Sequence, residues 1–223
     1  MGKLLKIPFT KEPCGDLVGY HSFTQNDIRF IVIDTYDVAI MQRCPETSNK
    51  RKQAEDILSM NNHNFAADES KLNSPEGLTG VEKRFVAFNG GIDVVQLAWL
   101  RQTLQEAKNM GQRAIILSHQ PIHPKSSSPV CLIWNYEEVL NILRDYRSTV
   151  IASFCGHAHR GGYHRDTKSG IHFRVIEAVL ESPDPIKTYG IVDVHSDRLE
   201  LRGNGACISA SYDFSHMNRE ATC

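Results

Sequence analysis

The sequence predicts an α/β fold, because two apolar strands flank a helix in one continuous stretch of chain. The strands are RAIILSH (113–119) and TVIASFCGH (149–157), each a short run rich in isoleucine or valine that leads directly into a turn. Between them, Asn135 and Glu138 have the spacing of a capping box, followed at helical spacing by Tyr136, Val139, Leu140, Leu143 and Tyr146. This order predicts a βαβ unit with parallel strands and a right-handed crossover.

A second helix is predicted immediately before this unit. Asp93 and Gln96 mark its start, because an acidic or polar side chain there can bond the free N–H groups of the first turn. One apolar face follows, made of Leu97, Leu100, Leu104 and Ala107. Gly111 is expected to end the helix, since glycine is common just after the last turn.

Further strands are expected on both sides of these elements. RFIVIDTYD (29–37) is an apolar run that ends in polar residues. HFRVIEA (172–178), YGIVDVHSD (189–197) and RLELRG (198–203) alternate apolar and polar residues. The last two are expected to form an antiparallel hairpin around the Ser-Asp pair between them.

The least regular part of the chain is 42–83, which is rich in Asn, Ser, Glu and Lys. A helix near 50–60 is expected there, with LNSPEGL (72–78) as a loop. The 223 residues are enough for one substantial core, so we expect a single domain over 1–223 with residues 206–223 as a tail.

Composition narrows the possible functions. The net charge is -1, so no global basic field favours a nucleic-acid polymer or an anionic membrane as partner. No apolar run approaches the ~20 residues of a membrane span, and the N-terminus lacks the apolar stretch of a secretory signal. Six cysteines are scattered without a CxxC pair, which is typical of reduced thiols. We therefore expect a cytoplasmic protein.

Histidines end both of the buried strands. His119 follows the first strand, and His157 and His159 follow the second, after Gly156, which is expected to allow a sharp exit. In an extended segment two residues that stand two apart point to the same side, and ligands collect beyond the carboxyl ends of parallel strands. Three converging imidazoles predict a divalent metal site, with a polar strand cap as the alternative for each histidine alone. The remaining histidines of interest are expected to be surface or packing residues (His123, His164, His172 and His195).

These histidines belong to a longer series of ordered motifs. The chain resembles the calcineurin-like metallophosphoesterases, and among them the manganese-dependent ADP-ribose/CDP-alcohol diphosphatases, over about residues 20–205. The resemblance is carried by the IDTYD strand, LNSPEGL, FNGG (88–91), QLAWL (96–100), SHQPIHP (118–124), VCLIWNY (130–136), GHAHRGGY (156–163) and EAVLESP (177–183).

The resemblance implies a fold, a metal centre and a reaction. The fold would be the C-terminal part of a β-sandwich flanked by helices, in four layers α/β/β/α. Two divalent ions would lie between the sheets, manganese first and magnesium or zinc as alternatives, with His119 and His157 on one ion and His159 on the other. The resemblance also implies a full-length enzyme that would be a monomer and would hydrolyse ADP-ribose, CDP-choline and other CDP-alcohols to AMP or CMP and a phosphate ester.

Candidate substrate-binding residues come from the same motifs and their neighbours. They are Asn89, Gly90, Trp134, Asn135, Arg160 and Tyr163. Asn89 and Gly90 would meet phosphate or simply turn the chain into the next helix, and Trp134 would stack on a nucleobase or belong to the core. Arg160 and Tyr163 would contact phosphate, with solvent exposure as the alternative for Arg160.

Three motifs of the family are not found upstream of the RFIVID strand: D-x-H, G-D-x-x-D and G-N-H-E/D. In the family these motifs carry the bridging carboxylate and the catalytic histidine, so no catalytic residue is assigned in this chain. We expect at most one metal ion here, because no carboxylate would offset the repulsion between two ions. The chain is expected to match the C-terminal two-thirds of the enzyme, with apolar surface and strand edges exposed. An inactive metal-binding, nucleotide-binding or regulatory protein is the alternative function, and a structural role without metal is a third.

Overall fold

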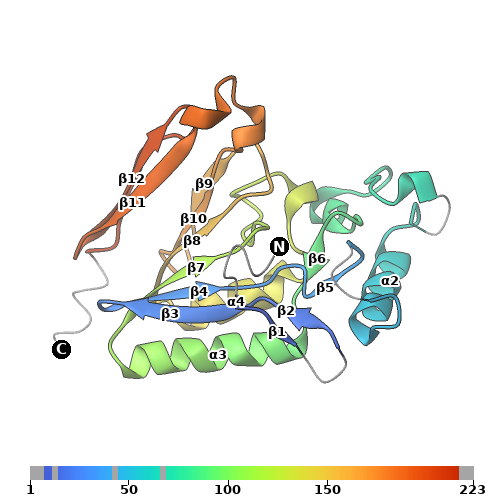
Figure 1. Cartoon of the computed structure of the whole chain (residues 1–223), viewed down its shortest axis with the longest axis horizontal. Coiled ribbons are helices and arrows are strands. Elements are labelled where there is room, and N and C mark those ends of the chain that lie inside the picture. The colour runs from blue at the N-terminus through green and yellow to red at the C-terminus, as the bar shows by residue number, and fades with distance from the viewer. Residues whose placement is uncertain (1–7, 12–14, 42–44, 66–68, 216–223) are drawn as a thin grey trace.

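The computed structural model describes residues 8–11, 15–41, 45–65 and 69–215 (Figure 1). The α-helices are α2 (Asn49–Asn61), α3 (Val94–Asn109) and α4 (Tyr136–Asp145). Short 3-10 helices lie at η1 (Glu69–Lys71), η2 (Gly80–Arg84), η3 (Pro129–Cys131), η4 (Val179–Glu181) and η5 (Pro185–Lys187). Within the described ranges, no helix is both long enough and apolar enough to cross a membrane.

The described residues form a large sheet of six strands in the order β3-β4-β7-β8-β10-β9. Its strands are β3 (His21–Gln25), β4 (Ile28–Val32), β7 (Arg113–Leu117), β8 (Val150–Cys155), β9 (Gly162–Arg165) and β10 (His172–Val175). The inner four are parallel and the two edge strands are antiparallel. The predicted parallel pair β7 and β8, joined through α4, is confirmed.

A small sheet of three strands is also present in the described chain, in the order β11-β12-β13. Its strands are β11 (Tyr189–Val194), β12 (Arg198–Asn204) and β13 (Ala210–Asp213). The predicted hairpin is confirmed, with Val194 opposite Leu199 at its turn. The prediction of a tail from 206 is wrong for its first part, because β13 pairs with β12; residues 216–223 lie outside the described residues.

Two minor ladders complete the strand pairings. One joins β1 (Thr10–Lys11) to β2 (Leu17–Val18), and the other joins β5 (Val38–Ala39) to β6 (Gly90–Gly91). The second holds the FNGG segment against the loop that follows β4.

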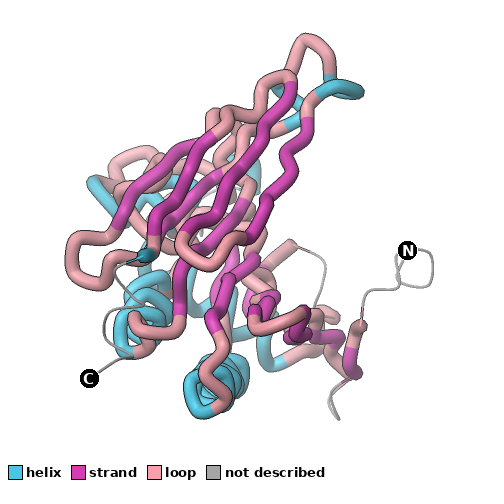
Figure 2. The backbone as a smooth tube through the Cα atoms, turned by 90° about the vertical axis from the view of Figure 1, so that its left-hand side faces the viewer, coloured by secondary structure: helices cyan, strands magenta, loops and turns pink. Residues whose placement is uncertain are grey.

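The large sheet is covered differently on its two faces (Figures 1 and 2). Side chains alternate along β7, so Ile116 packs with α3 and α4 while Ile115 packs with the small sheet. The described chain therefore has three layers, helices, large sheet and small sheet. The four layers implied by the resemblance are not reached, since the outer face of β11 is exposed at Tyr189 and Ile191 and no described helix covers it.

The helix α3 begins and ends as predicted. The Asp93 carboxylate accepts a hydrogen bond from the backbone N–H of Gln96 at 2.9 Å. Gly111 adopts the left-handed conformation with φ +67°, the usual geometry just after a helix. The inward face contains Leu100, Leu104 and Ala107, all fully buried.

The predicted capping box of α4 is wrong. Asn135 precedes the helix, but its side chain makes no cap bond to the first turn. Its amide instead accepts from the backbone N–H of Ile92 at 3.0 Å and donates to the Ile92 carbonyl at 2.8 Å and to Glu138 at 2.7 Å. The backbone of Ile92 uses the amide oxygen and nitrogen of Asn135 that the cap would need, and the sequence around Asn135 does not reveal this contact.

Buried polar groups lie where β4 ends. The Gln96 side chain accepts from the Asp34 backbone N–H at 2.7 Å and donates to the Asp37 carboxylate at 2.9 Å. Lys50 from α2 lies 2.5 Å from the same carboxylate and 3.3 Å from Asp93. This network joins β4, α2 and α3, so Gln96 has a tertiary role beyond the helix start where the sequence places it.

Candidate active site

The candidate site lies beyond the carboxyl ends of β7 and β8. Hydrogen bonds continue past the ladder, from Ser118 N–H to the Phe154 carbonyl at 3.1 Å and from Gly156 N–H to the His119 carbonyl at 3.0 Å. These bonds hold the segments that follow β7 and β8 side by side, and Nε2 of His119 lies 3.1 Å from Nδ1 of His157. Two of the three predicted metal ligands therefore meet directly.

The protonation of His157 follows from the contacts of Asn89. The Asn89 amide nitrogen donates to the carbonyls of Arg84 at 2.8 Å and Val130 at 2.7 Å, which fixes the orientation of the amide. Its oxygen must then face Nε2 of His157, 2.8 Å away, and this nitrogen carries the proton. Nδ1 of His157 keeps its lone pair, directed at His119, as a metal ligand requires.

The turn after β8 differs from the prediction. Gly156 does not take the left-handed conformation; His157 does, with φ +66°, so the segment is not the extended H-x-H expected. This conformation costs a non-glycine residue roughly 1–2 kcal/mol and is typical of functional sites. Further along, a Cβ on Gly162 would lie 2.0 Å from the Ser126 carbonyl oxygen, so only glycine fits there.

His159 is exposed, as is His119, and it has a carboxylate partner. Its Nδ1 lies 2.9 Å from Oε1 of Glu181, which ends η4. Both line a cavity of about 570 Å³ together with Phe88, Ser128, Cys131, His157, Ala158, Arg160 and Gly161. Sequence reasoning did not assign Glu181 to the site, although it lies inside the EAVLESP motif.

The electrostatic state of the histidines suits metal binding. Burial lowers the pKa of His157 to about 4, helped by the neighbouring His119 and His159. Burial also lowers the pKa of His119, with a smaller contribution from His159. Both rings are therefore neutral near pH 7. Since Nδ1 of His157 accepts, Nε2 of His119 donates in the 3.1 Å contact, and it would give up that proton to bind a cation.

Two of the three predicted ligands, His119 and His157, have a spacing that suits one divalent ion. His159 does not join them in a group of three, because within the described residues the group whose ligand atoms lie within 4.8 Å of one another is His123, His164 and Asp166. Two nitrogens that each lie ~2.1 Å from one ion, at a right angle, are about 3 Å apart, which agrees with the 3.1 Å between His119 and His157. Imidazoles with one carboxylate are ligands that manganese and zinc accept. Of the described residues that line the cavity, Glu181 is the one carboxylate, so a bridge between two ions is not evident.

Asn89 and Gly90 do not meet the expectation of phosphate contact. Asn89 is fully buried and its amide is used in supporting His157. Gly90 is also buried; its N–H donates to Gln120 at 3.2 Å and its carbonyl accepts from Trp134 at 2.8 Å. A Cβ on Gly90 would lie 2.5 Å from the Thr35 carbonyl oxygen, so the glycine serves close backbone packing.

Trp134 and Asn135 likewise make contacts within the fold and do not line the cavity. Trp134 is 2% exposed, packs with Val38, Leu58 and other apolar residues, and donates from Nε1 to the Val86 carbonyl. It belongs to the core, which was one of the two alternatives for this residue, and contact with a nucleobase stays an untested prediction. Asn135 is occupied by the Ile92 backbone, as described above.

Arg160 and Tyr163 lie in different places. Arg160 is exposed and lines the cavity beside the histidines, where contact with a phosphate remains a prediction. Tyr163 is on β9, and its hydroxyl lies 2.9 Å from Nδ1 of His172. It is not among the residues that line this cavity.

A second histidine cluster was not predicted. His123, His164 and Asp166 bring potential ligand atoms within 4.8 Å of one another. However, Nδ1 of His123 accepts from the Lys125 backbone N–H, so Nε2 carries the proton and faces Asp166 at 3.5 Å. Arg144 binds both oxygens of the same carboxylate, so the contacts favour a structural network over a metal site.

Comparison with known proteins extends these observations. A manganese-dependent ADP-ribose/CDP-alcohol diphosphatase from Oryza sativa is 39% identical over 91% of this chain and 60% of its own length. The Arabidopsis thaliana and human proteins of the same name are each 36% identical, over 93% and 86% of this chain. The chain is a homologue of the manganese-dependent ADP-ribose/CDP-alcohol diphosphatases. No protein-family model matches it.

A solved structure agrees with this result. The crystal structure of a dimetal phosphatase from Danio rerio superposes with a TM-score of 0.81 at 33% identity, over 89% of this chain and 61% of that one. The resemblance to the diphosphatases is therefore confirmed. The chain spans about 60% of the length of the relatives, 60% for the rice protein and 64% for the Arabidopsis protein.

Proposed function

We propose that this protein takes part in metal-dependent hydrolysis of pyrophosphate bonds in nucleoside diphosphate compounds. The substrates would be ADP-ribose, CDP-choline and other CDP-alcohols, and addition of one water would release AMP or CMP and a second phosphate ester. The observation that carries the proposal is the pairing of His119 with a His157 whose free nitrogen is selected by Asn89. The names of the homologues supply the substrate class.

Each residue of the site has a proposed role. His119 and His157 would hold the ion through Nε2 and Nδ1, and His159 would bind through the nitrogen that Glu181 leaves free. Arg160 would neutralise the phosphate charge at the cavity rim. When bound, a divalent ion polarises a phosphoryl oxygen and lowers the pKa of coordinated water.

A second candidate function is metal or nucleotide binding without turnover. It is favoured by the scarcity of carboxylates at the site, since Glu181 is the one carboxylate among the described residues that line the cavity. Two ions close together need negative charge between them to offset their repulsion. Metal binding is common to both functions, and turnover separates them.

The test is hydrolysis of ADP-ribose and CDP-choline by the purified chain with manganese, beside metal binding by calorimetry. His157→Asn is the informative variant, because asparagine tolerates the left-handed conformation that His157 adopts. His195→Asn, outside the site on the β11–β12 turn, is the matched control. Turnover that is lost only in His157→Asn supports the hydrolase. Metal binding without turnover supports the second function. If the chain shows neither turnover nor metal binding, both functions are overturned.

A further inference from the structure

Three serines of this chain are followed directly by proline, the dipeptide that proline-directed protein kinases modify. They are Ser74, Ser128 and Ser182. Phosphorylation needs a hydroxyl that the kinase can reach and that the fold has not already engaged. The structure therefore separates the three positions, which the sequence leaves equivalent.

The hydroxyls of Ser74 and Ser182 are engaged in the fold. Oγ of Ser74 accepts from the backbone N–H of Glu76 at 3.3 Å, and the residue is partly buried. Oγ of Ser182 donates to the Asp184 carbonyl at 3.1 Å and accepts from the hydroxyl of Thr188 at 2.6 Å. A kinase would have to open these turns to reach either oxygen.

Ser128 differs from both. Its side chain is exposed, and its hydroxyl makes no hydrogen bond to any residue that the structure describes. Its backbone is extended, with φ -61° and ψ 135°, as is usual for the residue before a proline. Protein kinases bind the segment that they modify in an extended conformation, so Ser128 has a suitable backbone in the folded protein.

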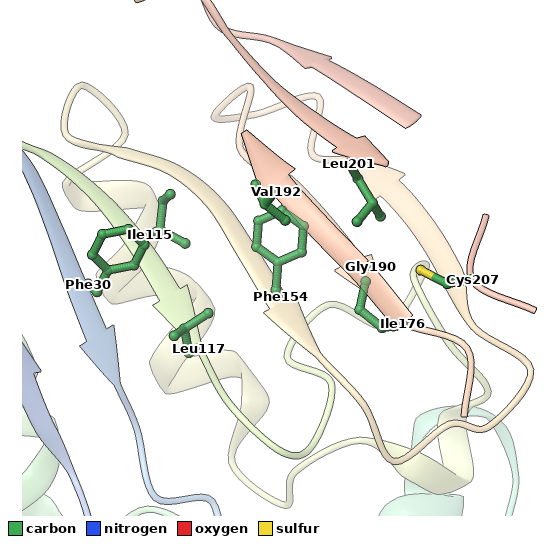
Figure 3. Close-up of a pocket in the computed structure, with 9 residues that line it drawn as sticks. All are labelled: Phe30, Ile115, Leu117, Phe154, Ile176, Gly190, Val192, Leu201 and Cys207. Carbon is green, nitrogen blue, oxygen red and sulfur yellow. The ribbon is translucent and has the colours of Figure 1, made fainter. Parts of the chain in front are cut away.

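Ser128 also lines the cavity of the candidate active site, together with His157, His159 and Arg160. Arg160 is exposed there, so its guanidinium is available to an anion. By contrast, the described residues that line the cleft between the two sheets carry no charge (Figure 3). A phosphate on Ser128 would thus enter the hollow in which substrate phosphate is proposed to bind.

We propose that Ser128 is a phosphorylation site for a proline-directed protein kinase, and that its phosphate blocks the cavity to anionic substrates. The kinase would transfer the γ-phosphoryl group of a nucleoside triphosphate to Oγ of Ser128. The bond from that phosphorus to the oxygen of the β-phosphate breaks, a bond to Oγ forms, the hydroxyl proton passes to a base of the kinase, and a nucleoside diphosphate leaves. The blocking effect rests on the proposed function, whereas the modification does not.

The added group changes the charge of the cavity. A phosphoserine carries about -1.5 to -2 charges at pH 7 and accepts strong hydrogen bonds from arginine. It would compete with substrate phosphate for Arg160 and repel the anionic substrate. The same negative charge attracts cations, and manganese accepts oxygen ligands. Anion affinity should therefore fall while manganese affinity rises, a combination that steric blocking alone does not produce.

The first experiment tests the modification. The purified chain and three short synthetic peptides, one centred on each serine, are treated with ATP and a proline-directed kinase that labels all three peptides. Mass spectrometry measures the rate at each position. Ser128 in the chain should be labelled within threefold of the rate of its peptide, and Ser74 and Ser182 at least tenfold more slowly than theirs. A tenfold loss at Ser128 as well would overturn the site.

The second experiment tests the blocking effect with Ser128→Asp and with Ser128→Asn, which has a similar size and no charge. Calorimetry measures manganese affinity and, at saturating manganese, the affinity for AMP. The Asp variant should bind AMP at least fivefold more weakly than the Asn variant and manganese at least twofold more tightly. Ser59→Asp, which adds the same charge on the exposed face of α2, is the control for net charge.

The remaining outcomes are distinguishable. Equal AMP affinities of the two Ser128 variants, shown by circular dichroism to be folded, would overturn the blocking effect. If the unmodified chain binds neither AMP nor manganese, the proposed function fails and the blocking effect fails with it. The labelling rates of the first experiment still decide whether Ser128 is a phosphorylation site.

Discussion

Oδ1 of Asn89 lies 2.8 Å from Nε2 of His157, and this contact selects which nitrogen of His157 is free to bind a metal. The amide has no choice of orientation, because its nitrogen is used by two backbone carbonyls. Supporting contacts of this kind set the orientation and protonation state of metal-binding histidines. Asn89 was predicted to contact the substrate, but its side chain instead orients His157, the proposed metal ligand.

Asn89→Ala should therefore weaken manganese binding. We expect the affinity to fall about 10–100-fold, the usual cost of losing such a supporting partner, together with about 1–3 kcal/mol of stability from the two carbonyls left unpaired. Calorimetric titration with manganese measures the first and urea unfolding the second. Asn61→Ala, an amide on the exposed end of α2, is the control. Unchanged affinity would remove Asn89 from the metal site.

The left-handed conformation of His157 predicts an unusual stability order. His157→Gly and His157→Ala both remove the imidazole, so both should abolish metal binding at this position. Glycine adopts positive φ without strain, so His157→Gly should be more stable than His157→Ala by about 1 kcal/mol. Urea unfolding without metal measures the difference. Equal stabilities would argue against the φ of +66° found for His157.

Glu181→Gln tests the carboxylate beside His159. We expect manganese affinity to fall about tenfold, because the partner that orients His159 loses its charge. Stability should change by less than about 0.5 kcal/mol, because exposed ion pairs contribute little; the two side chains are 44% and 63% exposed. Glu200→Gln, which removes a similar surface partner from His195, is the control and should leave the affinity unchanged.

Lys50→Met should be strongly destabilising. Burial raises the pKa of the Asp37 carboxyl, and the hydrogen bond from Lys50 is the largest effect that opposes this rise. Removing one partner of a buried pair costs about 3–5 kcal/mol. The double variant Lys50→Met/Asp37→Leu should recover part of that loss, since the unpaired buried carboxylate of Asp37 is gone, while Asp93 still loses its contact with Lys50. Lys52→Met, exposed on the same helix, is the control, and all four proteins are compared by urea unfolding.

Stability should depend on pH through His123. Burial, with a smaller contribution from His164, lowers the pKa of His123 to about 4, although Asp166 opposes both effects. The unfolded chain therefore binds more protons than the folded one between pH 4 and about 6.5, so stability rises with pH across this window, by no more than about 3 kcal/mol. His123→Phe should flatten that rise in a pH series of urea unfolding curves. An unchanged pH dependence in the variant would assign it to other groups.

The sequence determined the elements whose pattern is local. The apolar runs of β7 and β8, the face of α3 and the β11–β12 hairpin follow from residue periodicity and turn residues, and two histidine motifs at strand ends indicate the candidate site. Such signals depend only on neighbours along the chain, so they can be read without a structure.

Only the tertiary structure decided which side chains reach the site. Asn89 and Glu181 meet histidines 68 and 22 residues away, and Trp134 and Asn135 turn away from the cavity because the core and the Ile92 backbone bind them first. The left-handed conformation of His157 is also invisible in the sequence. Each depends on contacts between distant segments, and competition among partners in three dimensions decides which contact forms.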